Sequence, residues 1–120
     1  MKIYIAAKYG HAAHIKEKIA PRIEALGHEV TSHWINGDEE GKGPQGAAVM
    51  DVADVLRADC CLSLSEPYGS ENKGGGRHFE FGMAYQAGKR CIVVGHLEIV
   101  FHHLESVEYY PDLDAALEAL

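Results

Sequence analysis

Short apolar runs alternate with longer amphipathic stretches along this chain. The apolar runs are rich in branched and aromatic side chains, and their length favours buried strands over helices. They lie at Lys2–Ala7, Glu29–Ser32, Cys60–Leu64, Cys91–Gly95 and Val107–Tyr109. The sequence therefore predicts about five strands.

Between these runs, apolar residues recur every three or four positions, which predicts amphipathic helices. The predicted helices are His11–Leu26, Ala47–Ala58, Arg77–Ala87 and Leu113–Leu120. Gly27 and Gly88 are typical helix stops, and Asp112 is a candidate cap for the last helix. Pro21 lies inside the first helix and is expected to kink it, because proline cannot donate the helical hydrogen bond.

Two polar, glycine-rich segments, Asn36–Gly46 and Ser65–Gly76, are predicted to be loops, and Val100–Leu104 a turn. Strands that alternate with helices predict an α/β fold, here a three-layer open parallel sheet of flavodoxin or Rossmann type. Residues 1–120 are expected to form one domain. Such sheets bind ligands at the carboxyl ends of their strands, and both glycine-rich loops follow a predicted strand.

Composition and charge narrow the expected partners. The chain has 120 residues, of which 47% are apolar, so it can bury a core without disulfides or metals. Its formal net charge is −7 and it has no basic run. Nucleic acids and anionic membranes are bound by clustered Lys and Arg, so neither is an expected partner. A small anionic ligand remains compatible, because it needs only one or two donors.

The three cysteines, Cys60, Cys61 and Cys91, all fall in or beside predicted strands. An odd number of cysteines in apolar runs is typical of reduced thiols, so we expect an intracellular, cytoplasmic protein. No apolar stretch approaches 18 residues, so no membrane span is expected.

The most informative segment is 73–82, in which Gly74, Gly75 and Gly76 lead into the third predicted helix. Glycines let backbone N–H groups approach a ligand, and a helix start offers unpaired donors. Glu80 lies in the predicted first turn, where an ionised carboxylate is stabilised. Such a carboxylate suits covalent glycosyl transfer, but it is equally typical of a surface residue that complements the helix dipole. The segment carries neither a dinucleotide fingerprint nor a P-loop.

Three further acids and one tyrosine are candidates. Asp51 follows the first glycine-rich loop and is placed to face the cleft edge. Asp54 is expected on a solvated helix face, and Asp59, at the start of a strand, is expected to be structural. Tyr4 lies within the first strand, where a tyrosine is usually part of the core, but its hydroxyl needs a partner if buried.

Four patterns recur in one order along the chain. They are Ile3-Tyr4-Ile5-Ala6-Ala7 in the first strand, Asp51 ahead of Ala58-Asp59, Glu80-Phe81-Gly82-Met83-Ala84, and the strand Gly88-Lys89-Arg90-Cys91-Ile92-Val93-Val94. Together they resemble the nucleoside 2-deoxyribosyltransferase family, which includes 2′-deoxynucleoside 5′-monophosphate N-glycosidases. The resemblance covers residues 2–95.

The resemblance implies cleavage or transfer at the N-glycosidic bond of a (deoxy)nucleoside or its 5′-monophosphate, without a cofactor. It implies that Glu80 is the nucleophile of a covalent glycosyl intermediate, that Tyr4 orients it, and that Asp51 handles the leaving base or the sugar. A general acid at Asp51 requires a raised pKa. The family works as dimers or higher assemblies, so at least a homodimer is expected.

If the substrate carries a 5′-phosphate, the loop Ala7-Lys8-Tyr9-Gly10-His11 is the expected phosphate site. Lys8 and His11 supply charge there, and the following helix start supplies N–H donors. Arg77 is a second candidate.

Two departures from the family pattern leave base specificity, and hydrolase against transferase activity, open. Family members carry Asp or Ser six residues before the nucleophile, where this chain has Gly74. Ser65, Ser70, Asn72 and Arg77 are candidate replacements. The transferases also use a C-terminal Asn from a neighbouring subunit, whereas this chain ends in a predicted helix.

The histidines and the tryptophan add weaker signals. No His forms an HExxH motif or a Cys/His quartet, so no metal site is expected. His102 and His103 are candidates to reach a neighbouring active site in a dimer. Trp34 is placed to stack on a base or, as is more common, to pack in the core.

Two other functions compete with the enzyme. One is a nucleotide-binding module that has lost turnover, which Gly74 favours and the trio of Tyr4, Asp51 and Glu80 opposes. The other is a glycohydrolase of NAD-type nucleotides, for which the long first loop would frame a larger pocket.

Overall fold

The computed structural model describes residues 1–70 and 74–120. In this described part, the chain forms one five-stranded sheet whose neighbouring strands all pair in parallel. The strands are β1 (Lys2–Ala6), β2 (Glu29–Val30), β3 (Cys60–Leu64), β4 (Arg90–Val94) and β5 (Glu108–Tyr110). Their order, β2-β1-β3-β4-β5, is that of flavodoxin-like sheets, which confirms the predicted fold class.

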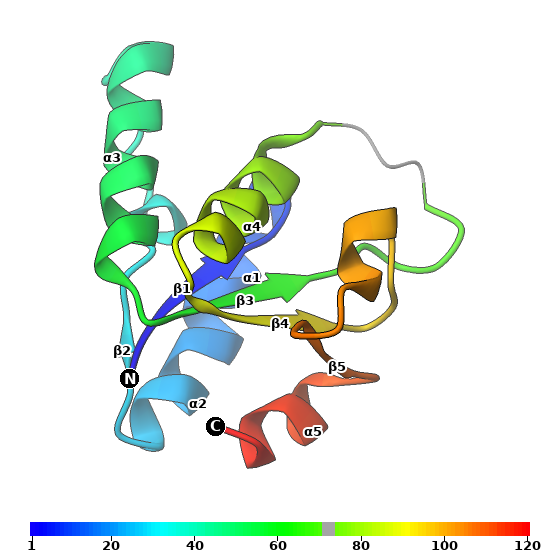
Figure 1. Ribbon diagram of the computed structural model, residues 1–120. Coiled ribbons are helices and arrows are strands. Elements are labelled where there is room, and N and C mark those ends of the chain that lie inside the picture. The colour runs from blue at the N-terminus through cyan, green and yellow to red at the C-terminus, as the bar shows by residue number, and fades with distance from the viewer. Residues whose placement is uncertain (71–73) are drawn as a thin grey trace.

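Helices cover both faces of the sheet (Figure 1). On one face lie α3 (Gly43–Arg57), α4 (Gly76–Gln86) and the short 3-10 segment η4 (Val100–His103). On the other face lie α1 (Ala12–His14), α2 (Ala20–Ala25) and α5 (Leu113–Glu118). Asp112 caps α5 as predicted, because its side chain accepts a hydrogen bond from the Ala115 N–H at 2.8 Å.

The strand order reverses at β1, which pairs with β2 on one side and with β3 on the other. At such a switch point the connecting segments diverge beyond the carboxyl ends of the strands and leave a crevice for a ligand. The segment after β1 includes the 3-10 turn η1 (Tyr9–His11), and the glycine-rich segment after β3 leads into α4. Both segments expected to bind a ligand therefore start at this edge.

The first predicted helix is interrupted one turn before Pro21. Ile15–Ile19 form a π-helical segment, η2, in which the Ala20 N–H donates to the Ile15 carbonyl. Proline has no N–H, and its ring clashes with the carbonyl four residues earlier, so a wider turn relieves the conflict. The irregularity expected from Pro21 is thus a π-bulge between α1 and α2.

The helix α3 begins at Gly43 and not at Ala47, so the predicted loop 36–46 was drawn too long. Pro44 lies in the first turn of α3, where proline is favoured because its missing N–H would have no helical partner. The rest of that segment consists of the 3-10 turn η3 (His33–Asn36) and the turns at 37–42.

The core contains the three cysteines, which are free and buried. Cys61 and Cys91 are directly opposed in the register of β3 and β4. Burial raises the pKa of the Cys60 thiol to about 12 and that of Cys91 to about 11. Within the described residues, no helix is long and apolar enough to cross a membrane.

Candidate active site

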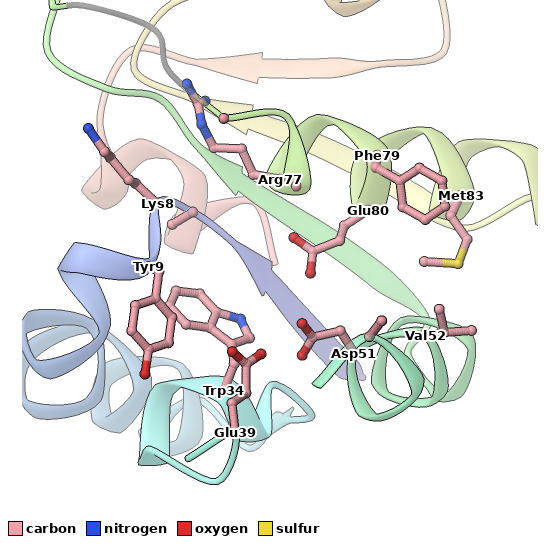
Figure 2. Close-up of a pocket in the computed structure, with 14 residues that line it drawn as sticks. Lys8, Tyr9, Trp34, Glu39, Asp51, Val52, Arg77, Phe79, Glu80 and Met83 are labelled. Carbon is pink, nitrogen blue, oxygen red and sulfur yellow. The ribbon is translucent and has the colours of Figure 1, made fainter. Parts of the chain in front are cut away.

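A cavity of about 460 Å³ lies beside the carboxyl end of β1, between α3 and α4 (Figure 2). Its volume suits a small-molecule ligand. The lining residues are Ala7, Lys8, Tyr9, Trp34, Glu39, Ala48, Asp51, Val52, Gly74, Gly76, Arg77, Phe79, Glu80 and Met83. The cavity is thus polar around the carboxyl groups of Glu39, Asp51 and Glu80. It is apolar along Ala48, Val52, Phe79 and Met83.

Tyr4 and Glu80 meet although they are far apart in sequence. Tyr4 is completely buried in β1, and its hydroxyl donates a hydrogen bond to the Glu80 Oε2 atom on α4. The sheet therefore supplies the donor and the helix supplies the carboxylate. This satisfies the buried hydroxyl, whose pKa is raised first by burial and then by the Glu80 charge, so it stays a donor.

Glu80 lies beyond the first turn of α4, which contains no acidic residue. The expected stabilisation by unpaired N–H groups at the helix start is therefore not what holds its charge. Burial raises the pKa of Glu80 to about 7, the Tyr4 hydrogen bond works against this rise, and the Glu39 charge adds to it. Glu80 therefore titrates near neutral pH, and Tyr4 favours its ionised form.

Asp51, on α3, lines the same cavity and faces the Glu80 carboxyl (Figure 2). Burial raises the pKa of Asp51 to about 8, and a hydrogen bond and the charge of Glu39 add to the rise, as does the charge of Glu80. Burial and Glu39 thus favour the protonated form of Asp51, while the Tyr4 hydrogen bond favours the ionised form of Glu80. Such separation of two acids by their surroundings is typical of acid–base sites.

Glu39 is a site residue that the sequence reasoning missed. It belongs to the turn between η3 and α3 and lines the cavity beside Asp51. The local sequence Asp38-Glu39-Glu40 gives no signal to single out the middle acid. Trp34 helps to hold this turn, because its Nε1–H donates to the Ile5 carbonyl at 2.9 Å. Trp34 is thus a core residue with one side on the cavity.

Asp54 was expected on a solvated helix face, and this was wrong. Asp54 is only 3% exposed. Its carboxylate accepts hydrogen bonds from the His33 backbone N–H at 3.0 Å and from the Arg57 guanidinium at 3.1 Å. Asp54 therefore joins η3 to α3. Asp59 has the structural role expected of it, since it accepts a hydrogen bond from the Lys2 N–H at 2.8 Å.

The cavity includes six of the nine residues predicted to bind substrate: Ala7, Lys8, Tyr9, Gly74, Gly76 and Arg77. Gly10, His11 and Gly75 are not among its lining residues. The His11 ring instead contacts the buried Glu66 carboxylate at 3.0 Å. The predicted phosphate loop thus faces the cavity with its first half.

Arg77 anchors the start of α4. Its side chain is buried and its guanidinium donates to both oxygens of Glu98, one of them at 2.8 Å. Burial acts to raise the pKa of Glu98, but the hydrogen bonds and charge of Arg77 outweigh it and lower that pKa. Much of the Arg77 charge is therefore compensated before any ligand binds.

The structure describes two of the other candidate replacements at the Gly74 position. Ser65 and Ser70 are not among the lining residues of the cavity, and the Ser65 hydroxyl contacts His96 at 3.2 Å. Asn72 lies outside the described residues.

His102 is buried, which contradicts its expected reach toward a neighbouring subunit. Its Nδ1 atom accepts from the Glu98 N–H at 3.1 Å, and burial lowers its pKa to about 4. Among the residues that the structure describes, no three His, Cys, Asp or Glu side chains are grouped closely enough to hold a metal ion.

Comparisons with known proteins add one finding. No family model and no curated protein matches the sequence. Among solved structures, the chain is similar to the Clostridium botulinum CMP N-glycosidase BcmB, with a TM-score of 0.68 and 19% sequence identity. The match covers 99% of this chain and 97% of that chain. At this identity the similarity establishes the fold.

Proposed function

We propose that this protein cleaves the N-glycosidic bond of a (deoxy)nucleoside or its 5′-monophosphate, with Glu80 as the nucleophile. The observation that carries the proposal is the hydrogen bond from buried Tyr4 to Glu80, with Asp51 lining the same cavity as Glu80. A protein with the same fold is a CMP N-glycosidase, which supports this class of bond.

In the first step, a Glu80 carboxylate oxygen attacks the sugar C1′. The C1′–N bond breaks, its electron pair passes to the base, and Asp51 gives the base a proton. The transition state resembles an oxocarbenium ion, which the nearby carboxylate stabilises. Tyr4 keeps the attacking carboxylate ionised and oriented, because its hydroxyl donates to Oε2.

In the second step, water attacks C1′ and the bond to Glu80 breaks, returning the electron pair to the carboxylate. Asp51, now ionised, accepts the proton of the water. If a second base attacks in place of water, the same intermediate gives transfer. Glu80 and Asp51 thus both return to their starting states, as a catalytic cycle requires.

A 5′-phosphate fits the end of the cavity formed by Lys8 and the loop before α4. Lys8 lines the cavity next to the start of η1, and Gly74 and Gly76 carry no side chain there. The ammonium and the nearby backbone N–H groups suit an anion. The compensated Arg77 is a positioning residue of this end, because it fixes the start of α4.

The test is release of free base from a panel of nucleosides, nucleoside and deoxynucleoside 5′-monophosphates, and NAD, with and without an acceptor base. We expect release from at least one nucleoside or monophosphate, lost by 10³-fold or more in Glu80→Gln on the scale of a missing nucleophile. The control is Glu24→Gln, an exposed acid of α2 outside the cavity.

The outcomes separate the competing functions. Full activity of Glu80→Gln would refute the nucleophile. Release from NAD alone would indicate the larger-nucleotide glycohydrolase, and binding without any release would indicate the module that has lost turnover. Exchange that needs an acceptor base would identify a transferase.

We further propose that the chain works as at least a homodimer. Five apolar residues on α3, α4 and η4 are half or more exposed: Val49, Leu56, Phe79, Val100 and Phe101. Exposed apolar side chains on the helices of one layer favour burial against another protein surface. Light scattering should give at least twice the mass of one chain, and a monomer at working concentration would contradict this.

A further inference from the structure

A third carboxyl group, that of Glu39, shares the cavity with Asp51 and Glu80 (Figure 2). Glu39 reaches it from the turn before α3, and its side chain acts to raise the pKa of Asp51. Carboxylates that share a partly buried cavity repel one another and lose hydration, so their neighbours favour a protonated form. The arrangement therefore favours a proton within this group of three acids.

The second oxygen of Asp51 gives an independent indication. Oδ1 is buried and, among the described residues, has no hydrogen-bond partner. A buried oxygen without a partner costs more on an ionised carboxylate than on a neutral carboxyl. The site of this proton is therefore Asp51.

The charged groups around Asp51 act in the same direction. Glu39 on the turn, Glu80 on α4 and Asp54 on α3 itself all favour the neutral form of Asp51, after burial. The Tyr4 hydroxyl on β1 stays protonated and so adds no charge. Among the described residues, the cations that line the cavity are Lys8, which is exposed, and Arg77, which is paired with Glu98.

We propose that Glu39 is a positioning residue of the reaction, whose carboxylate keeps the transferable proton on Asp51. This inference rests on the proposed function and adds a residue to it. When Asp51 gives its proton to the departing base, two neighbouring carboxylates are left. Their repulsion favours recovery of a proton from the attacking water, which is the proton that the second step must remove. Glu39 thus serves both halves of the cycle without touching the reacting atoms.

The test compares Glu39→Gln with Glu40→Gln, which removes the same charge from the next residue. Glu40 is exposed and is not a lining residue of the cavity. In the wild type, activity needs ionised Glu80 and protonated Asp51, so the pH profile is bell-shaped. Glu39 acts on Asp51 by a hydrogen bond and by charge, but on Glu80 by charge alone. In Glu39→Gln the alkaline limb should therefore move to lower pH by more than the acid limb.

The size of the effect on kcat follows from how far the alkaline limb of the pH profile moves. For each unit that the alkaline limb moves down, kcat above it falls about tenfold, with KM little changed. Glu40→Gln should keep the wild-type profile, and Glu39→Asp should recover part of the alkaline limb. An unchanged profile in Glu39→Gln, or a loss of equal size at every pH, would overturn the inference.

A measurement without substrate separates this inference from the proposed function. The side-chain carboxyl carbon of Asp51 can be followed by NMR through a pH titration of each variant. Asp51 should titrate above pH 7 in the wild type and in Glu40→Gln, and at lower pH in Glu39→Gln. The same midpoint in all three would overturn the inference even in an active enzyme. A shifted midpoint in a protein that cleaves no substrate would refute the proposed function and leave the carboxyl pair established.

Discussion

Glu80 is held between one effect that neutralises its carboxyl group and another that ionises it. Burial raises its pKa, while the hydroxyl of Tyr4 donates to Oε2 and lowers it. A hydrogen bond to a charged group contributes about 1.5–3 kcal/mol. The residue that controls the nucleophile is therefore a strand tyrosine from the far end of the sequence.

Replacing Tyr4 by Phe should raise the pKa of Glu80 above its value of about 7, because only the lowering effect is removed. A smaller share of Glu80 is then ionised at neutral pH. We expect kcat/KM to fall about tenfold or more at pH 7 and below, and to recover in part as the pH rises. The measurement is the pH profile of base release.

Tyr85→Phe is the matched control, because it removes the same hydroxyl from a tyrosine of α4 that does not line the cavity. It should keep the wild-type profile. A loss in Tyr4→Phe that is equal at every pH would show that Tyr4 acts on something other than the ionisation of Glu80.

Among the elements, the contact between η3 and α3 decides where two of the three carboxyl groups lie. Asp51 is on α3, and Glu39 is on the turn that joins η3 to it. Asp54 fixes the two elements together by accepting from His33 and Arg57. The geometry of the acid pair therefore depends on a residue that faces away from the ligand.

Asp54→Asn should lower the free energy of unfolding by about 2 kcal/mol, because the buried carboxylate loses its charge-assisted bonds to His33 and Arg57. Urea denaturation followed by circular dichroism measures the change. The control is Asp114→Asn, whose partner Arg22 and whose own side chain are both exposed, so a change below about 0.5 kcal/mol is expected. Equal effects in the two variants would contradict the link.

Most elements were predictable from the sequence because their signals are local. Strands such as Cys60–Leu64 and the cap at Asp112 depend on a few neighbouring residues, and both were predicted where they occur. The sequence places the start of α3 too late because its glycines favour a loop, whereas Pro44 lies in the first turn of the helix. The π-bulge before Pro21 follows from a proline in mid-helix, but the sequence does not say whether the helix bends or widens.

The candidate site was predictable only in part, for a related reason. Tyr4, Asp51 and Glu80 fall at recognisable positions in the chain order. Asp51 and Glu80 line one cavity, and Tyr4 hydrogen-bonds Glu80 from the sheet. The positions of Glu39 and His102 depend on how turns fold back on the sheet, and no periodicity records this. Their importance lies in burial and in neighbours from other elements, which only the folded chain supplies.

For the whole molecule, the acid site links stability to pH. Asp51 and Glu80 have raised pKa values, so they stabilise the native state fully at low pH and lose this contribution as the pH rises through about 7 and 8. Burial lowers the pKa values of His78 and His102. These two groups therefore change the stability only below the ordinary histidine pKa of about 6.5. The free energy of unfolding should therefore fall between pH 6.5 and 8.5, by about 1 kcal/mol once access of water to the cleft is allowed for.

The double variant Asp51→Asn/Glu80→Gln lacks both groups and should show little change over the same range. Urea titrations at several pH values give the comparison. A wild-type stability that rises with pH across this range would show that the two acids are not neutralised by burial.

The three cysteines of the sheet have a practical consequence for finding ligands. Cys60, Cys61 and Cys91 are almost fully buried and free, so a thiol reagent reaches them only when the sheet opens. When the reagent concentration is low, the labelling rate therefore reports the fraction of native chains that are open. A compound that binds only the closed form reduces the open population by the factor 1 + [L]/Kd. Slower labelling thus identifies compounds that bind the folded chain, including tightly bound molecules that the protein never converts.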